Sequence, residues 1–133
     1  MPKEPKEHWK QDPDDHDFPA AFDYLSLVLG TDAARSAVSA LRHGSATTRK
    51  AKDLLRASDL VLLPMDNAHV ASDLAKVKSG ERLSPVLVVR GDLERSRPLT
   101  VADGYHRICA SYHLDENADI PCRIVDLPSR SGG

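Results

Sequence analysis

The sequence predicts an α+β fold, in which a helical N-terminal region precedes a mixed sheet with packed helices. Apolar residues recur at helical spacing in the first half, whereas short strand-like runs alternate with helical patterns in the second. The chain of 133 residues, 41% of them apolar, fits one hydrophobic core. We expect a mobile arm over 1–17, a helical region over 18–58, a core over 59–128 and a flexible tail over 129–133.

Helix signals fill the region after the arm. Proline at the first helical position, capping residues and glycine stops mark the ends of the apolar patterns. These signals predict three helices: over 19–29, from Thr31 or Asp32 to Gly44, and from Ser45 through Leu55. Helices this short are stable when their apolar faces are buried, so we expect them to pack on the core or on a partner.

The second half alternates strands and helices. The apolar run 60–63 ends at Pro64, and 85–89 is rich in valine without polar alternation, which is typical of a strand buried on both faces. The expected elements are a helix from Asp66 to about Ser79, a strand over 85–89, an exposed connection over 91–98, a strand over 99–102, a helix over 105–113 and a strand over 121–125.

Charge and hydropathy narrow the function classes. The formal net charge of -2 argues against nucleic acid as a partner and makes a DNA nuclease the least favoured class. Basic residues between 35 and 56 fit a local basic face or ordinary solvated helix faces. No apolar run predicts a membrane span or signal peptide, so we expect a cytoplasmic protein. Cys109 and Cys122 are expected as buried free thiols, with a single disulfide between them as the alternative.

The motif Asp103-Gly-Tyr-His-Arg107 follows a predicted strand and opens a predicted helix. Free amides at a helix start form an anion site, and Gly104 allows a ligand to approach the backbone closely. Arg107 adds a guanidinium fork that suits phosphate, and His106 can donate a hydrogen bond or move a proton near neutral pH. Tyr105 can stack on a base or pack internally. The motif therefore predicts a phosphate-binding turn.

Each of these residues also has a structural interpretation. Arg107 can pair with Asp103 or cap the turn, and Asp103 can serve as a turn-forming residue. A zinc site is a further alternative, because one helix carries histidine and cysteine at close spacing. The set is His106, Cys109 and His113, with Cys122 in the next strand. Spacing alone does not predict coordination, and we expect no metal bound to the protein through these side chains.

The motif and its flanks resemble the ParB/sulfiredoxin superfamily over about residues 60–127. The resemblance lies in a proline-containing strand at 84–89, the turn and helix start at 103–110, and an Ile-Pro strand at 120–125. It implies an α+β fold whose Gly-x-x-Arg turn binds the phosphates of a nucleotide.

The resemblance also assigns residues. Gly104 and Arg107 occupy the family's phosphate-binding positions, His106 matches the sulfiredoxin histidine, and Arg82 is a second candidate phosphate contact. Tyr105 replaces the cysteine with which sulfiredoxins attack, so thiol chemistry of that kind is not expected.

Two further comparisons with the family concern activity. Glu116-Asn117 lacks the downstream arginine of ParB proteins that clamp around CTP, so CTP clamping and centromere binding are not expected. ParB-like serine kinases use an acidic base near the turn, for which Asp103 or Glu81 is a candidate.

Two hypotheses follow. In the first, the turn binds a nucleotide or another phosphorylated ligand, with phosphoryl transfer or nucleotide hydrolysis as the chemistry. Mg²⁺ then bridges the phosphates, and His106 or Asp103 moves the proton. In the second, the chain is a non-catalytic binding or regulatory protein, such as an antitoxin-like subunit or scaffold, whose N-terminal helices dock a protein partner. The sequence does not decide between them or define the ligand.

Overall fold

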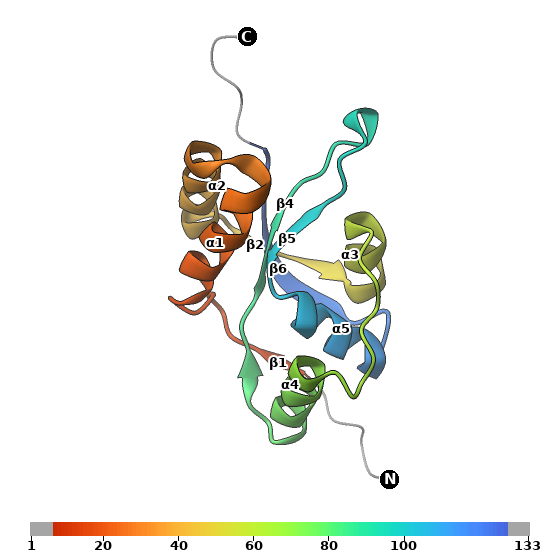
Figure 1. Cartoon of the computed structure of the whole chain (residues 1–133). Coiled ribbons are helices and arrows are strands. Elements are labelled where there is room, and N and C mark those ends of the chain that lie inside the picture. The colour runs from red at the N-terminus through yellow and green to blue at the C-terminus, as the bar shows by residue number, and fades with distance from the viewer. Residues whose placement is uncertain (1–6, 128–133) are drawn as a thin grey trace.

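A computed structural model describes residues 7–127 as a mixed sheet with helices on both faces (Figure 1). Residues 1–6 and 128–133 lie outside the described part, and with them the tail expected over 129–133. The α+β class is confirmed. The described elements are β1 (His8–Trp9), α1 (Asp17–Leu29), α2 (Thr31–His43), β2 (Ala46–Lys50), α3 (Ala51–Ser58), α4 (Ala68–Lys78), β3 (Arg82–Leu83), β4 (Val86–Val89), the 3₁₀ turn η1 (Leu93–Arg95), β5 (Thr100–Asp103), α5 (Tyr105–Leu114) and β6 (Asp119–Val125).

The four-stranded sheet has the order β2-β6-β4-β5. β6 runs parallel to β4, whereas the two outer pairs are antiparallel. All four residues of β4 are buried, which agrees with the valine-rich pattern that predicted this strand. Because side chains alternate along a strand, β4 supplies apolar side chains to both faces.

Each face of the sheet is covered by its own helices (Figure 1). Leu87 and Val89 join one apolar cluster with Leu25 of α1 and Leu41 of α2. On the other face, Val86 and Val88 belong to a second cluster, whose helical members include Leu54 of α3, Val70 of α4 and Ile108 of α5. The sheet is therefore the middle of three layers.

The third helix predicted from Ser45 is wrong in its first part. Residues 46–50 form β2, which pairs antiparallel with β6 over five residues, and α3 begins at Ala51. Thr47 and Thr48 are β-branched, so their side chains favour the extended backbone of a strand. The region over 18–58 is consequently not wholly helical, and α3 packs with α5 on the core.

The mobile arm expected over 1–17 is also corrected for its described part. β1 pairs in parallel with β3, and Trp9 packs against the buried cluster around α5. Ser111 of α5 donates a hydrogen bond to Glu7, and Asp12 pairs with Arg123 at 3.0 Å. Long-range contacts of this kind hold the segment, although its composition resembles that of a flexible arm.

The remaining elements lie close to their predicted positions. α4 begins one residue later than expected, because the Asn67 side chain, and not Asp66, accepts hydrogen bonds from the amides of His69 and Val70 at 3.0 and 3.2 Å. The connection over 91–98 is largely exposed. Within residues 7–127, no helix has the length and apolar character needed to cross a membrane.

Candidate functional site

Gly104 forms the tight turn between β5 and α5. Its φ of 110° lies in a region that residues with a Cβ rarely adopt, and an added Cβ would lie 2.4 Å from Cγ1 of Val86. The glycine is therefore required by packing against β4. Within residues 7–127, no side-chain hydrogen bond caps the start of α5, so the first amides of this helix keep unused donors.

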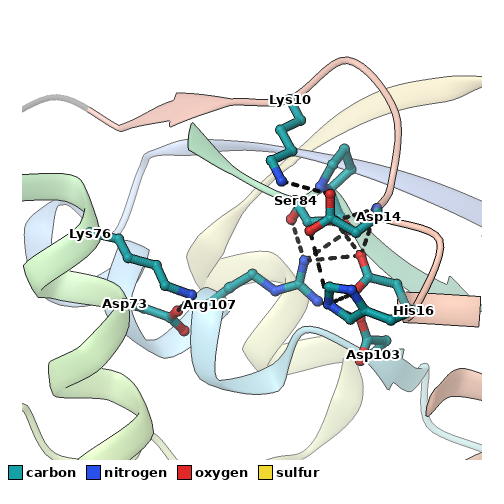
Figure 2. A network of polar contacts seen from close by, with 10 residues as sticks. Lys10, Asp14, His16, Asp73, Lys76, Ser84, Asp103 and Arg107 are labelled. Carbon is teal, nitrogen blue, oxygen red and sulfur yellow. Dashed lines mark hydrogen bonds and ion pairs between the residues drawn. The ribbon is translucent and has the colours of Figure 1, made fainter. Parts of the chain in front are cut away.

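Arg107 is bound within the protein. Its guanidinium donates hydrogen bonds to the Ser84 carbonyl and the Asp103 carboxylate, and Nη1 lies 3.7 Å from Oδ2 of Asp17 (Figure 2). The side chain is 12% exposed. The structure thus matches the pairing alternative, in which Arg107 ties the turn to β4 and to the start of α1.

Asp103 and Asp17 form a buried pair of carboxylates around this guanidinium. Burial raises the pKa of Asp103 to about 6; Arg107 lowers this pKa and Asp17 raises it. Asp17 is 4% exposed and accepts a hydrogen bond from the Ser84 hydroxyl. A proton on Asp103 would relieve its like-charge repulsion with Asp17.

A small polar cleft of about 190 Å³ opens between α4 and the start of α5. Lys76 contributes its ammonium group, which lies 3.9 Å from Oδ1 of Asp73. The rings of His69 and His106 lie 4.6 Å apart. Burial, and then His69, lower the pKa of His106, so its ring is neutral at pH 7 and can accept a proton.

A second cavity of about 360 Å³ adjoins this cleft and shares several walls with it. Arg82 and Glu81 line it, so the structure brings both predicted residues to the same region as Arg107. Tyr105 points elsewhere, because its hydroxyl donates to the Val61 carbonyl. Tyr105 therefore holds the 60–63 segment, and its side chain does not line the cleft.

Asp14, His16 and Asp17 place three ligand atoms within 4.8 Å of one another. Nε2 of His16 lies 3.4 Å from Oδ1 of Asp17 and 4.0 Å from Oδ2 of Asp14. Ligand atoms on a tetrahedral metal with bonds of about 2.1 Å lie about 3.4 Å apart. The other oxygen of each carboxylate is held by Lys10 or Ser84, which fixes the free oxygens toward His16.

The zinc alternative considered for the α5 histidines and cysteines finds no support in the described residues. The group around His16 is the one set of three that meets within them. Cys109 and Cys122 are buried free thiols, and Nε2 of His113 contacts the Leu63 carbonyl at 2.7 Å.

Sequence reasoning missed two parts of this site. His69, Asp73 and Lys76 have the i, i+4, i+7 spacing of one helix face, a signal that the predicted helix over 66–79 already contained. Asp14 and His16 carried no such signal, because the arm gains its position from the pairing of β1 with β3.

The chain was compared with family models, with curated proteins and with solved structures, and none of the three comparisons gives a match. The function is therefore argued from the site.

Proposed function

We propose that this protein binds a phosphorylated small molecule, with nucleotides as the leading candidates, in the cleft between α4 and the start of α5. One observation carries the proposal: uncapped amides of α5 open beside a cleft lined by Lys76, His69 and His106. The resemblance of this turn to the ParB/sulfiredoxin Gly-x-x-Arg turn supports the same ligand class.

In this proposal, Arg107 holds the turn in position and does not itself bind the phosphate. Its partners Ser84 and Asp103 fix the guanidinium behind the turn, so it keeps the α5 amides and the Gly104 backbone in place. Lys76 takes the direct cationic role that the sequence assigned to Arg107. Arg82 is exposed on the neighbouring cavity and suits a second, outer phosphate.

A divalent cation would accompany the phosphate. The adjoining cavity is lined by five carboxylates against four lysines and arginines, and its fifth basic group is His16. This excess of carboxylates over fixed positive charges disfavours a bare polyanion. The Asp14, His16 and Asp17 group can hold a cation there, and the cation offsets this excess. Because imidazole suits Mn²⁺ or Zn²⁺ better than Mg²⁺, we expect Mn²⁺ to support binding more strongly than the Mg²⁺ inferred from sequence.

A phosphoryl-transfer or hydrolysis step in this cleft would use His106 or Asp103 as the proton acceptor. Both side chains line the cleft, but Asp103 is already engaged with Arg107. His106 therefore has the better access to a substrate hydroxyl or a water molecule.

Isothermal titration calorimetry with ATP, ADP, CTP and GTP, each with and without Mn²⁺ or Mg²⁺, tests the binding proposal. Lys76→Ala should weaken binding about tenfold, about 1.4 kcal/mol, because it removes the cleft's ammonium group. Lys78→Ala is the matched control, since Lys78 is exposed on the same helix and does not line the cleft. Absence of binding to all four nucleotides, with inorganic phosphate also silent, would sink the proposal.

A second candidate function, a non-catalytic binding protein, is favoured by a different observation. α1 exposes Tyr24, Leu27 and Val28, with Leu27 83% exposed, on the surface turned away from the sheet. In that case a specific partner captured by the tagged chain should be lost with Leu27→Asp and kept with Lys76→Ala. The reverse pattern would favour the phosphate cleft as the functional surface.

A further inference from the structure

A cavity of about 840 Å³ lies between α3 and the connection from β4 to β5. It shares no lining residue with the two cavities at the α5 turn. Figure 1 shows the connection projecting beyond the sheet on the α3 side, at the end away from α4. This cavity is thus a separate feature of the molecule.

Main-chain contacts build the walls of this cavity. The Leu99 amide donates to the Ala57 carbonyl at 2.9 Å, which fastens the connection to α3. Gly91 lets the two limbs of the connection meet, because a Cβ there would lie 2.5 Å from the Arg97 carbonyl oxygen. The backbone of the fold therefore forms part of these walls, and exposed side chains complete them.

The cavity combines an apolar floor with a basic rim. Leu54, Leu99 and Ile124 supply the apolar surface. Four arginines and three aspartates line the remainder: Arg49, Arg56, Arg90, Arg97, Asp53, Asp59 and Asp92. The excess of arginine over aspartate favours an anion as the ligand, and the apolar floor favours an anion that also carries an apolar group.

Two of these arginines have their guanidinium groups available. Arg90 pairs with Asp126 at 2.9 Å, and Arg49 donates to the Thr48 carbonyl at 2.9 Å. Within residues 7–127, the side chains of Arg56 and Arg97 make no hydrogen bond or ion pair. Arg56 comes from α3 and Arg97 from the connection, so each wall contributes one free fork that suits carboxylate or phosphate oxygens.

We propose that this cavity binds an amphipathic organic anion, whose apolar body packs on Leu54, Leu99 and Ile124 and whose carboxylate or phosphate lies between Arg56 and Arg97. The volume falls within the roughly 300–1,000 Å³ of small-molecule sites. The proposal stands independently of the phosphate cleft at α5, because the two sites share no residue.

The experiment uses 2-naphthoate, 1-naphthyl phosphate and uncharged 2-naphthol as probes on the full chain. Both anions should shift the backbone amide resonances of residues 53–59 and 91–99 in ¹H–¹⁵N spectra. By calorimetry, 2-naphthol should bind about tenfold more weakly than the better anion. Preference for naphthoate or naphthyl phosphate then identifies the acidic group that the site selects.

Variants decide whether the arginines carry the binding. Arg56→Gln with Arg97→Gln should weaken anion binding at least about tenfold, while Arg35→Gln, an exposed arginine of α2, should leave it unchanged. Each single variant is measured as well, so that one unstable protein does not decide the outcome.

Four results would overturn the proposal: no binding of either anion, equal binding of 2-naphthol and both anions, anion binding unchanged in the variant with both Arg56→Gln and Arg97→Gln, or amide shifts confined to 69–76 and 103–107. The last result would assign the anions to the α5 cleft instead. That cleft would then retain its own support while this site lost its basis.

Discussion

Arg107 shows how a motif residue acts through internal contacts. The sequence motif assigned its guanidinium to phosphate, yet two of its nitrogens already bond to Ser84 and Asp103. A guanidinium that is 12% exposed and bonded through both terminal nitrogens is better placed to brace the turn than to contact a ligand. In the proposed function, Lys76 and His106, which line the cleft, therefore take the direct contacts with phosphate.

Gly104 makes a stability prediction at this scale. Gly104→Ala should lower the free energy of unfolding by about 3 kcal/mol, because the new Cβ adopts an unfavourable φ and also overlaps Val86. Urea unfolding measures the loss. Gly80→Ala is the control, since Gly80 has a φ of 81° with nothing within 4 Å of a Cβ, and should cost about 1 kcal/mol. Equal losses in the two variants would contradict the packing argument.

Asp103 makes a prediction about pH. Its pKa is about 6 in the folded state against the ordinary 3.8, so the folded protein holds this proton more tightly than the unfolded chain. The unfolded state then binds fewer protons between about pH 4 and 6, and stability contributed by Asp103 is lost as pH rises through that window. As the pH rises from about 4 to 6, the free energy of unfolding of the wild type should therefore fall relative to that of Asp103→Asn.

Urea unfolding of wild type and Asp103→Asn at pH 4, 5, 6 and 7 measures this difference. Asp32→Asn makes the same charge change on a fully exposed side chain and is the control. A gap between wild type and Asp103→Asn that stays constant from pH 4 to 7 would show that the folded state does not raise this pKa.

At the scale of elements, local signals predicted some parts of the fold and long-range contacts decided the others. The strand over 85–89 and the helix over 105–113 were predictable, because valine runs and helix-start residues act over a few positions. β2 was not, since its partner β6 lies about seventy residues further along the chain. β1 likewise depends on its pairing with β3.

The candidate site likewise combines a part that local sequence predicts with parts that long-range contacts position. The Gly104 turn was found from its strand-turn-helix sequence, which is local. The contributions of α4 and of the segment around Asp14 depend on how α4 packs on α5 and on where β1 pairs. The spacing of His69, Asp73 and Lys76 places them on one face of a helix, but it does not reveal which element that face packs against.

Arg123 makes a prediction for α2. This buried side chain of β6 donates to the carbonyls of Leu41 and Arg42, both at 2.9 Å, and so caps the end of the helix. Arg123→Met should lower the free energy of unfolding by about 1–3 kcal/mol, because the Arg42 carbonyl loses this donor and the Leu41 carbonyl keeps only the Gly44 amide at 3.3 Å. The loss of the ion pair to Asp12 adds little, since Asp12 is 75% exposed. Hydrogen exchange should quicken most in the last turn of α2.

Arg35→Met is the matched control for this loss, since Arg35 is 68% exposed and pairs with Asp32 on the surface of α2. A loss below about 0.5 kcal/mol for Arg123→Met would show that Arg123 does not hold α2 on the sheet.

The whole molecule separates the two candidate sites. The sheet and its two apolar clusters form the centre, with α4 and β1 at one end and the connection from β4 to β5 at the other (Figure 1). The α5 cleft borders α4, and the α3 cavity borders the connection. Neither site includes the outer surface of α1, which stays free for a partner. A ligand at one end can therefore be detected without interference from the other.

The central claim is that the open amides of α5 bind phosphate, and backbone amide shifts test it most directly. ¹H–¹⁵N spectra are recorded while ATP is titrated into the protein in a buffer that contains Mg²⁺ and no Mn²⁺. Paramagnetic Mn²⁺ would broaden the signals. The account predicts that the largest shifts fall on the amides of Tyr105, His106 and Arg107, and that Lys76→Ala weakens the titration. Saturating shifts elsewhere, with these three amides unmoved, would contradict it.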